Sequence, residues 1–507
     1  KSEVDLTNGL SYQGVAITPN VNGARNQWQT AGFFGRINYN YAERYLAELN
    51  LRYDGTSKFR SDKMWKLFPS ISLGWRISEE NFMKNTKDWL SNLKLRLSYG
   101  SLGNQNIDNW YQTYQTIAYR AFTGYWLQNG QKTNTTSAPG LVSSLLTWEK
   151  VESYNVGLDF GFLNNRLTGS FDYFVRNTKN MVGKAPELPS ILGTGVPVTN
   201  NTDLRTNGWE LQLSWNDQLA NGLHYGVTFN LSDSRTKITR YPNNPTNSID
   251  TYIKGRYINE IWGYTTKGIA KSNEEMNAHL STTDQSTIGS NWAAGDIMYE
   301  DTNNDKQIND GARTITDHGD LKVIGNSTPR FLWGIDLNAS WKGFDIRAFF
   351  QGVMKRDAWL GGSWGSLEYY FGATNSGEWW ATGITAVKDY YRDANTWSVA
   401  NGYQKANQDA FLPRATFSNK NERCQTRYLM NAAYMRLKNF QAGYTIPRNI
   451  TTKWGISNMR VFVSIENLFT ITKMPKQFDP EIIGTDSRHS NGYPLSKTFS
   501  FGINVTF

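Results

Sequence analysis

Residues 30–56 read TAGFFGRINYNYAERYLAELNLRYDGT, and the alternation in this stretch decides the fold. From Phe33 to Tyr41, apolar or aromatic residues and glycine occupy every second position, while mostly polar residues fill the positions between them. The same period of two resumes at Tyr45 and continues to Tyr53. Successive side chains of a β-strand point to opposite faces, so both segments predict strands with one apolar face and one polar face.

The same alternation recurs to the end of the chain, and we count about thirteen strands of roughly ten residues, the length a tilted strand needs to cross a bilayer. Between Leu437 and Phe440 the alternation slips by one residue, which predicts a β-bulge. Residues 257–270 also predict a strand, which strand parity places inside a long loop. The other segments are 71–75, 93–99, 154–160, 167–175, 209–215, 223–231, 331–341, 344–350, 433–446, 458–470 and 496–507.

The connections between these segments alternate between short and long. Short links such as Tyr41–Glu43, Leu163–Asn165, Asp217–Gly222 and Trp341–Gly343 predict periplasmic turns. Long loops in a compact soluble domain would count against the strand assignments, but short turns on one side and long loops on the other are typical of outer-membrane barrels. The predicted extracellular loops are 102–150, 178–204, 236–329, 354–432 and 471–495.

The composition agrees with a transmembrane barrel. Aromatic residues make up 14% of the chain, with 19 Trp, 27 Tyr and 25 Phe, and outer-membrane barrels use aromatic girdles at both membrane interfaces. No segment approaches the roughly 18 apolar residues of a membrane helix. A soluble β-sandwich or propeller is the structural alternative. It would bury the apolar strand faces but would not need aromatic residues near strand ends.

Other functional classes find little support in the sequence. The net charge is +9, with Lys and Arg scattered rather than clustered, which argues against nucleic-acid binding. The lone Cys424 cannot form an internal disulfide. No nucleophile elbow, P-loop or metal-ligand histidine spacing occurs. Carboxylates such as Asp159, Asp172 and Glu210 fall on polar strand faces, where we expect them to line a lumen rather than to catalyse a reaction.

Strand parity extends the prediction beyond this chain. Bacterial single-chain barrels have even strand numbers, and plugged transporters have 22 strands. We therefore expect residues 30–507 to be the C-terminal part of such a barrel, with residues 1–29 as an extracellular loop. The first strands and a plug would then precede Lys1. Residues 1–10 are polar and contain no signal peptide, although an outer-membrane protein must be exported.

Several blocks of sequence resemble the SusC/RagA-type TonB-dependent outer-membrane transporters. Each block alone is weak, but their order and spacing are specific. They are Phe33-Phe34-Gly35-Arg36-Ile37-Asn38-Tyr39, Arg52-Tyr53-Asp54-Gly55, Phe68-Pro69-Ser70-Ile71, Trp148-Glu149-Lys150, Val323-Ile324-Gly325-Asn326, Tyr434-Met435-Arg436-Leu437-Lys438-Asn439, Glu466-Asn467-Leu468-Phe469, Phe478-Asp479-Pro480-Glu481 and Thr498-Phe499-Ser500-Phe501.

The resemblance implies active import of oligosaccharides, or of peptides in some members, across the bacterial outer membrane. It implies energy supplied by the TonB complex through the missing N-terminal part, and a SusD-like surface lipoprotein that closes over the barrel as a lid. A siderophore or cobalamin receptor is an alternative within the same superfamily. A secreted or surface β-rich glycan-binding protein is the alternative from another class.

Residues 300–308 have the oxygen-ligand spacing of a calcium loop. Asp301, Asn303 and Asp305 stand at positions 1, 3 and 5, and the carbonyl group of Gln307 stands at position 7. Lys306 replaces the usual turn glycine, and position 12 is Ala312, although Asp310 is available as a substitute ligand. A structural calcium site and an ion-free acidic turn therefore both remain open, and no other cofactor is expected.

Residues 357–397 are rich in aromatic side chains and glycine. Aromatic rings stack on sugars and anchor protein interfaces, so this segment predicts a contact with substrate or with the lid lipoprotein. Packing of the loop on itself is the alternative. The candidate contact residues are Trp359, Trp364, Tyr369, Tyr370, Trp379 and Trp380. Separately, the amphipathic segment that ends at Phe507 resembles the recognition signal of the barrel-assembly machinery.

Overall fold

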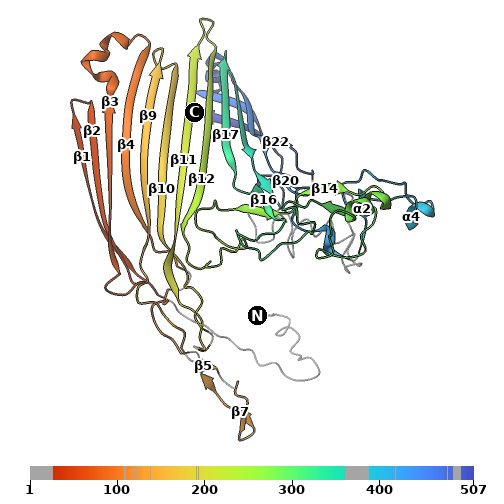
Figure 1. Cartoon of the computed structure of the whole chain (residues 1–507). Coiled ribbons are helices and arrows are strands. Elements are labelled where there is room, and N and C mark those ends of the chain that lie inside the picture. Colours follow the sequence, from red (N-terminus) through yellow and green to blue (C-terminus); the bar gives the residue numbers. More distant parts are fainter. Residues whose placement is uncertain are drawn as a thin grey trace.

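The computed structural model shows a tall, curved and open β-sheet with irregular loops gathered at one end (Figure 1). None of its helices is long and apolar enough to cross a membrane, within the residues the structure describes. Those residues are 27–507 without 108–109, 118, 121–122, 137–138, 190, 192, 360–387, 417, 477 and 484–492.

The sheet has 13 antiparallel strands, each paired with its neighbour along the chain once the small strands of the loops are set aside. The number of strands predicted from the alternation is therefore confirmed. The strands are β1 (Thr30–Tyr41), β2 (Tyr45–Thr56), β3 (Trp65–Arg76), β4 (Leu90–Asn104), β9 (Glu149–Phe162), β10 (Leu167–Lys184), β11 (Val198–Gln218), β12 (His224–Arg240), β17 (Arg330–Trp341), β18 (Phe344–Lys355), β21 (Tyr434–Thr445), β22 (Asn458–Thr472) and β23 (Thr498–Thr506).

The strand register keeps the two faces of the sheet separate. Tyr41 pairs with Tyr45 and Phe33 pairs with Tyr53, so the apolar positions of β1 and β2 share a face. The predicted bulge is present in β21, where the pairing with β22 shifts between Leu437 and Asn439. Because a one-residue shift reverses every side chain beyond it, the bulge explains why the alternation slips there.

Short turns close one end of the sheet, and long excursions leave the other end (Figure 1). At the short-turn end, β3 and β4 are joined by η2 (Ile77–Glu79) and η3 (Asn81–Thr86), and β21 and β22 by α5 (Arg448–Thr451) and η7 (Thr452–Trp454). The predicted loop 178–204 needs correction, because β10 and β11 remain paired as far as Lys184 and Val198. Beyond a register shift, the mostly polar residues of this segment continue the pairing of β10 with β11. The alternation of apolar and polar residues no longer marks a strand there.

The excursion between β4 and β9 carries two small hairpins. They are built from β5 (Tyr119–Arg120) and β8 (Thr135–Thr136), and from β6 (Leu127–Gln128) and β7 (Gln131–Lys132). At the base of this excursion, Phe59, Phe68, Ile107, Leu146 and Trp148 form a small buried cluster.

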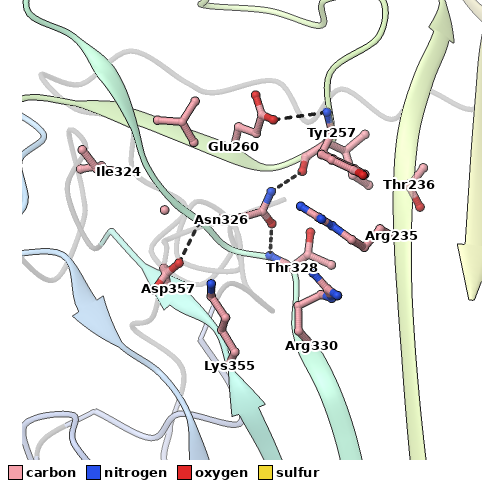
Figure 2. A pocket seen from close by; sticks show the side chains of 13 residues that line it. Arg235, Thr236, Tyr257, Glu260, Ile324, Asn326, Thr328, Arg330, Lys355 and Asp357 are labelled. Atoms are coloured by element: carbon pink, nitrogen blue, oxygen red, sulfur yellow. Dashed lines mark hydrogen bonds between the residues drawn. The ribbon is translucent and has the colours of Figure 1, made fainter.

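Beyond the last pairing between β12 and β17, another segment continues beside β12. The N–H of Ile238 donates to the carbonyl oxygen of Arg256 at 2.9 Å, and the N–H of Ile258 donates to that of Thr236 at 3.1 Å. Tyr257 therefore lies next to the end of β12, beside Arg235 and Thr236 (Figure 2).

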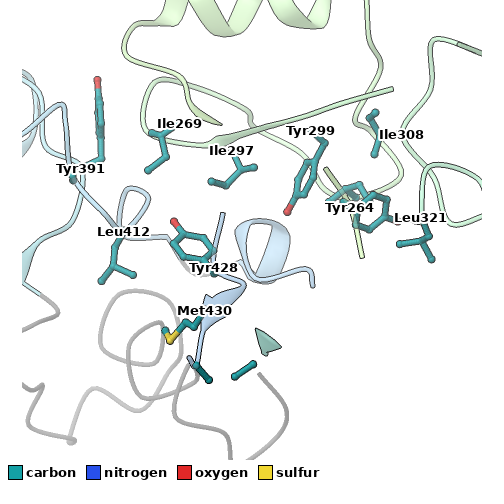
Figure 3. Packing of buried hydrophobic residues seen from close by; sticks show 14 of the residues in the cluster. Tyr264, Ile269, Ile297, Tyr299, Ile308, Leu321, Tyr391, Leu412, Tyr428 and Met430 are labelled. Atoms are coloured by element: carbon teal, nitrogen blue, oxygen red, sulfur yellow. The ribbon is translucent and has the colours of Figure 1, made fainter. Parts of the chain in front are cut away.

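The described residues of the excursions 241–329, 356–433 and 473–497 pack together into one unit, which we call the loop module. Its core contains Ile297, Tyr299, Ile308, Leu412 and Tyr428, which come from segments far apart in sequence (Figure 3). The segment 257–270, predicted as one strand, lies outside the large sheet, as parity required, but it forms two short strands that pair in separate two-stranded sheets. The small elements of the loop module are β13 (Glu260–Gly263), β14 (Thr266–Ile269), α2 (Asn273–Leu280), β15 (Ile297–Tyr299), β16 (Lys322–Asn326), β19 (Asp357–Ala358), α4 (Trp397–Ala400), η6 (Asn419–Asn421) and β20 (Met430–Asn431).

Candidate functional site

One face of the sheet has the pattern of a lipid-facing surface. Along β11 the residues of this outer face are Trp209, Leu211, Leu213 and Trp215, with a tryptophan at each end of the apolar run. The run spans about 20 Å along the strand. This length is close to the height of the apolar band on outer-membrane barrels, about 25 Å, and aromatic girdles lie at both borders of that band. The strand register places Leu231, Phe229 and Val227 of β12 opposite Leu211, Leu213 and Trp215.

The opposite, inner face carries charged groups that neutralise one another. Arg96 of β4 forms bidentate hydrogen bonds of 2.8–3.0 Å with Asp159 of β9 and 2.8–2.9 Å with Asp172 of β10. Glu210 pairs with Asp172 in the ladder and lies on the same face. Asp159, Asp172 and Glu210 are the carboxylates that the sequence predicted to line a lumen. Asp159 and Asp172 can lie side by side because the guanidinium of Arg96, on a third strand, binds both of them.

Further ion pairs follow the inner face around the sheet. Arg347 of β18 contacts Asp336 of β17 at 2.5 Å, and Arg460 of β22 contacts Asp345 of β18 at 2.5 Å. Alternation identifies the polar face of each strand, but only the register shows which opposite charges meet. The wall therefore presents many hydrogen-bonding groups with its charges largely compensated.

A buried charged network holds the loop module together. Asp296, whose side chain is 0% exposed, forms ion pairs with Arg414 at 2.9 Å and Lys420 at 2.8 Å. Asn421 also donates a hydrogen bond to it. Burial raises the pKa of Asp296, but the hydrogen bonds from Arg414, Lys420 and Asn421 outweigh burial and hold this pKa below its ordinary value.

Arg356 connects three parts of the loop module. Its guanidinium donates hydrogen bonds to the carbonyl oxygens of Ser327 at 3.2 Å, Pro480 at 3.3 Å and Ile483 at 2.7 Å. It lies directly after β18, so it fastens the module to the end of the wall. No sequence pattern marks this residue, because the three carbonyl groups are brought together only by the fold.

The predicted calcium loop is an exposed turn in which side-chain oxygens accept backbone hydrogen bonds. Asp301 accepts from the N–H groups of Asn304 at 2.6 Å and Lys306 at 2.8 Å, and Asp305 accepts from that of Gln307 at 2.8 Å. Lys306 has a φ of 67°, the conformation for which calcium loops use glycine. Positions 1, 3, 5 and 7 carry oxygen donors of the type that ligate calcium, but the carboxylates of Asp301 and Asp305 accept backbone hydrogen bonds in this structure. Among the described residues, no group of three or more Asp, Glu, His or Cys side chains is arranged to hold a metal.

Of the aromatic residues predicted to contact substrate or lid, the structure places Trp359, which is partly buried against the core of the loop module. Self-packing therefore accounts for this ring. Trp364, Tyr369, Tyr370, Trp379 and Trp380 lie outside the described residues. Elsewhere in the module, Trp397 is 70% exposed and stacks on Tyr403 with ring centroids 5.3 Å apart. At the other end of the sheet, Phe507 follows β23 and is exposed.

An antiparallel wall with an apolar outer face, aromatic borders and a polar inner face defines part of a transmembrane β-barrel. The family model described as TonB dependent receptor-like, beta-barrel matches residues 3–342. The chain belongs to this family of outer-membrane β-barrel proteins.

Two curated relatives extend the likeness over nearly the whole chain. TonB-dependent receptor P3 of Formosa agariphila is 28% identical over 530 residues, which cover 99% of this chain and 48% of the relative. TonB-dependent receptor SusC of Bacteroides thetaiotaomicron is 28% identical over 481 residues, which cover 94% of this chain and 43% of the relative. The chain thus spans about half the length of the curated relatives it matches.

A solved structure agrees with the fold. The RagAB peptide importer in its open-open state superposes with a TM-score of 0.72 at 23% identity, covering 98% of this chain and 49% of that chain.

Proposed function

We propose that this chain forms the C-terminal wall and mouth of a TonB-dependent transporter that imports oligosaccharides, or peptides, across the bacterial outer membrane. The observation that carries the proposal is the asymmetry of the thirteen-stranded wall, apolar outside and polar inside. Membership of the TonB-dependent receptor family supports it and leaves a secreted glycan-binding protein without support. Uptake would be driven by energy that the TonB complex supplies to the whole protein.

The inner face bears on the substrate class. Arg96, Arg347 and Arg460 each pair with carboxylates of the wall itself. A lumen with compensated charge suits a neutral, hydroxyl-rich solute, because no substrate charge is needed to satisfy it. This favours an oligosaccharide. The peptide alternative draws its support from the RagAB structure, which is described as a peptide transporter.

A siderophore or cobalamin receptor is the second candidate from the same superfamily. The similarity to SusC over 94% of this chain favours a SusC-type protein instead. A SusC-type assignment also brings a SusD-like surface lipoprotein as the partner. Such a lid would close over the long-loop end, where the loop module provides a wide folded platform.

Transport can be tested on the full-length protein in its native membrane. We expect cells with the gene to accumulate a labelled oligosaccharide, and cells without it or treated with a protonophore to lose that accumulation. A matched series of labelled peptides is the control for substrate class. Accumulation of peptides alone would replace the oligosaccharide proposal, and accumulation of neither class, or accumulation unaffected by the protonophore, would contradict active nutrient import.

The lid requires a separate measurement. An affinity tag on the full-length protein should recover one surface lipoprotein in equimolar amount from detergent extracts. Recovery of the barrel protein alone under mild detergent conditions, with uptake intact in the same cells, would contradict a stable lid.

A further inference from the structure

A basic cleft lies on the outer face of the wall, immediately past the aromatic border at the long-loop end. It has a volume of about 230 Å³, and its lining includes three cations, Arg205, Arg235 and Lys237, and one carboxylate, Asp233. The register places Arg205 and Trp209 in phase with Leu211, and Arg235 and Lys237 in phase with Leu231. These cations therefore share the lipid-facing side of the wall and do not face the lumen.

The cations of this cleft are in excess over the carboxylates around it. Asp233 is paired with Arg330, Asp203 with Arg240 at 2.9 Å, and Glu260 with Arg256 at 2.8 Å. Each nearby carboxylate thus has its own arginine. In the described part of the chain, no ion pair joins Arg205, Arg235 or Lys237 to a carboxylate, and all three side chains are exposed.

Strand pairing adds a second observation. Arg205 and Lys237 stand directly opposite each other on β11 and β12, and like charges in that position destabilise a sheet. The guanidinium of Arg235 lies 3.7 Å and the ammonium of Lys237 lies 4.9 Å from the centre of the Tyr257 ring. Arg235 also points into an adjoining cleft, together with Arg330 and Lys355 (Figure 2). Arg205 donates a hydrogen bond to the amide oxygen of Asn177 at 2.8 Å, so the partners of these three cations are neutral groups.

We propose that this cleft binds the phosphate of a lipid headgroup in the adjacent leaflet. Aromatic girdles mark the level of the headgroups, and the cleft lies directly beyond Trp209. Clusters of Lys and Arg at that level attract anionic headgroups, and arginine matches phosphate geometry with two parallel hydrogen bonds. Leu211 and Leu231 lie below the cleft on the same face, where the acyl chains of the bound lipid would run.

The test uses the full-length protein, purified in detergent and analysed by native mass spectrometry with a phosphorylated lipid A. We expect lipid adducts that vanish when the same lipid A has been treated with phosphatase. The triple variant Arg205→Gln, Arg235→Gln and Lys237→Gln should weaken the apparent affinity by on the order of a hundredfold, since each cation near a membrane surface contributes roughly a fivefold factor. The variant Arg205→Lys with Arg235→Lys should bind more weakly than the wild type but more tightly than the triple variant, because it keeps the charges and loses the paired hydrogen bonds.

A matched control removes three cations from the short-turn end, through Lys342→Gln, Arg448→Gln and Lys453→Gln, and should leave the adducts unchanged. Heat-modifiable migration in gel electrophoresis verifies that each variant is assembled. The proposal fails if the triple variant binds as well as the wild type, or if dephosphorylated lipid A binds equally. It also fails if millimolar inorganic phosphate displaces the lipid completely, which would indicate a free-phosphate site. Loss of a co-purifying lipoprotein with lipid binding intact would assign the cleft to a protein partner instead.

Discussion

The thirteen-stranded wall and the loop module use aromatic residues in opposite ways. On the wall, Phe33 is 68% and Phe501 is 82% exposed. In the loop module, Tyr299 and Tyr428 are 0% exposed and belong to one continuous core. A soluble surface does not tolerate a continuous exposed apolar face of this extent, whereas lipid does. The wall therefore depends on the membrane, and the module has the interior of a soluble domain.

The two regions also handle charge differently. The inner face of the wall distributes its ion pairs over partly exposed positions, such as Arg347 with Asp336. The loop module concentrates its charge at Asp296, which is completely buried. We therefore expect the module to open as a separate unit while the barrel remains folded, because regions with independent cores unfold with their own free energies.

The largest expected effect comes from breaking the buried network. Asp296→Ala leaves Arg414 and Lys420 without their carboxylate, and removing one partner of a buried pair costs about 3–5 kcal/mol. Hydrogen exchange on the full-length protein should show faster exchange across 260–326 and no change in β9–β12. Asp409→Ala, which removes an exposed pair with Lys271, is the control and should change little. Equal loosening of the barrel strands would show that the two regions unfold together.

The next effect tests the wall. Leu211→Arg puts a charge on the lipid-facing side near the membrane midplane, where arginine costs about 2–4 kcal/mol. Gln212→Arg, one residue away on the inner face, should be tolerated. Urea titration of the assembled barrel, followed by heat-modifiable migration, compares the two variants. If Gln212→Arg is the more damaging change, the assignment of the two faces is reversed.

Much of the wall could be predicted from the sequence, because a period of two fixes both the strand and its face. The slip after Leu437 even located the bulge. The prediction broke down where polar residues extend β10 and β11 beyond the apolar band, since alternation carries no information there.

The loop module was less accessible from the sequence. Its core joins Tyr299, Leu412 and Tyr428 across more than a hundred residues, and no local periodicity marks such contacts. The same limit applies to Arg356 and Asp296, whose partners are defined only by the fold. Trp359 was singled out as a contact residue on composition alone, and composition does not distinguish an exposed ring from one that packs on the core.

A smaller effect would sharpen the role of the acidic turn. If Asp301, Asn303 and Asp305 bind calcium, millimolar calcium should stabilise the loop module by about 1–2 kcal/mol, the linkage expected for a site of extracellular-module affinity. The effect should appear as slower proteolysis of 282–320 relative to a chelator, and Asp301→Ala with Asp305→Ala should abolish it. Glu274→Gln, elsewhere in the module, and magnesium in place of calcium serve as controls. Equal protection in the double variant would place the ion elsewhere.

The smallest expected effect is a partial loss of loop-module stability at acidic pH. The pKa of Asp296 is held below its ordinary value, so its ion pairs contribute stability that is present above the unfolded-state pKa of about 3.9 and is lost as the pH falls through the folded-state pKa. The loop module should therefore keep its hydrogen-exchange protection from pH 7 to about pH 5 and lose part of it only below about pH 4. Asp296→Asn should remove this acid-dependent loss while lowering protection at every pH. A loss beginning near pH 6 would instead implicate a histidine such as His279, which is buried in α2.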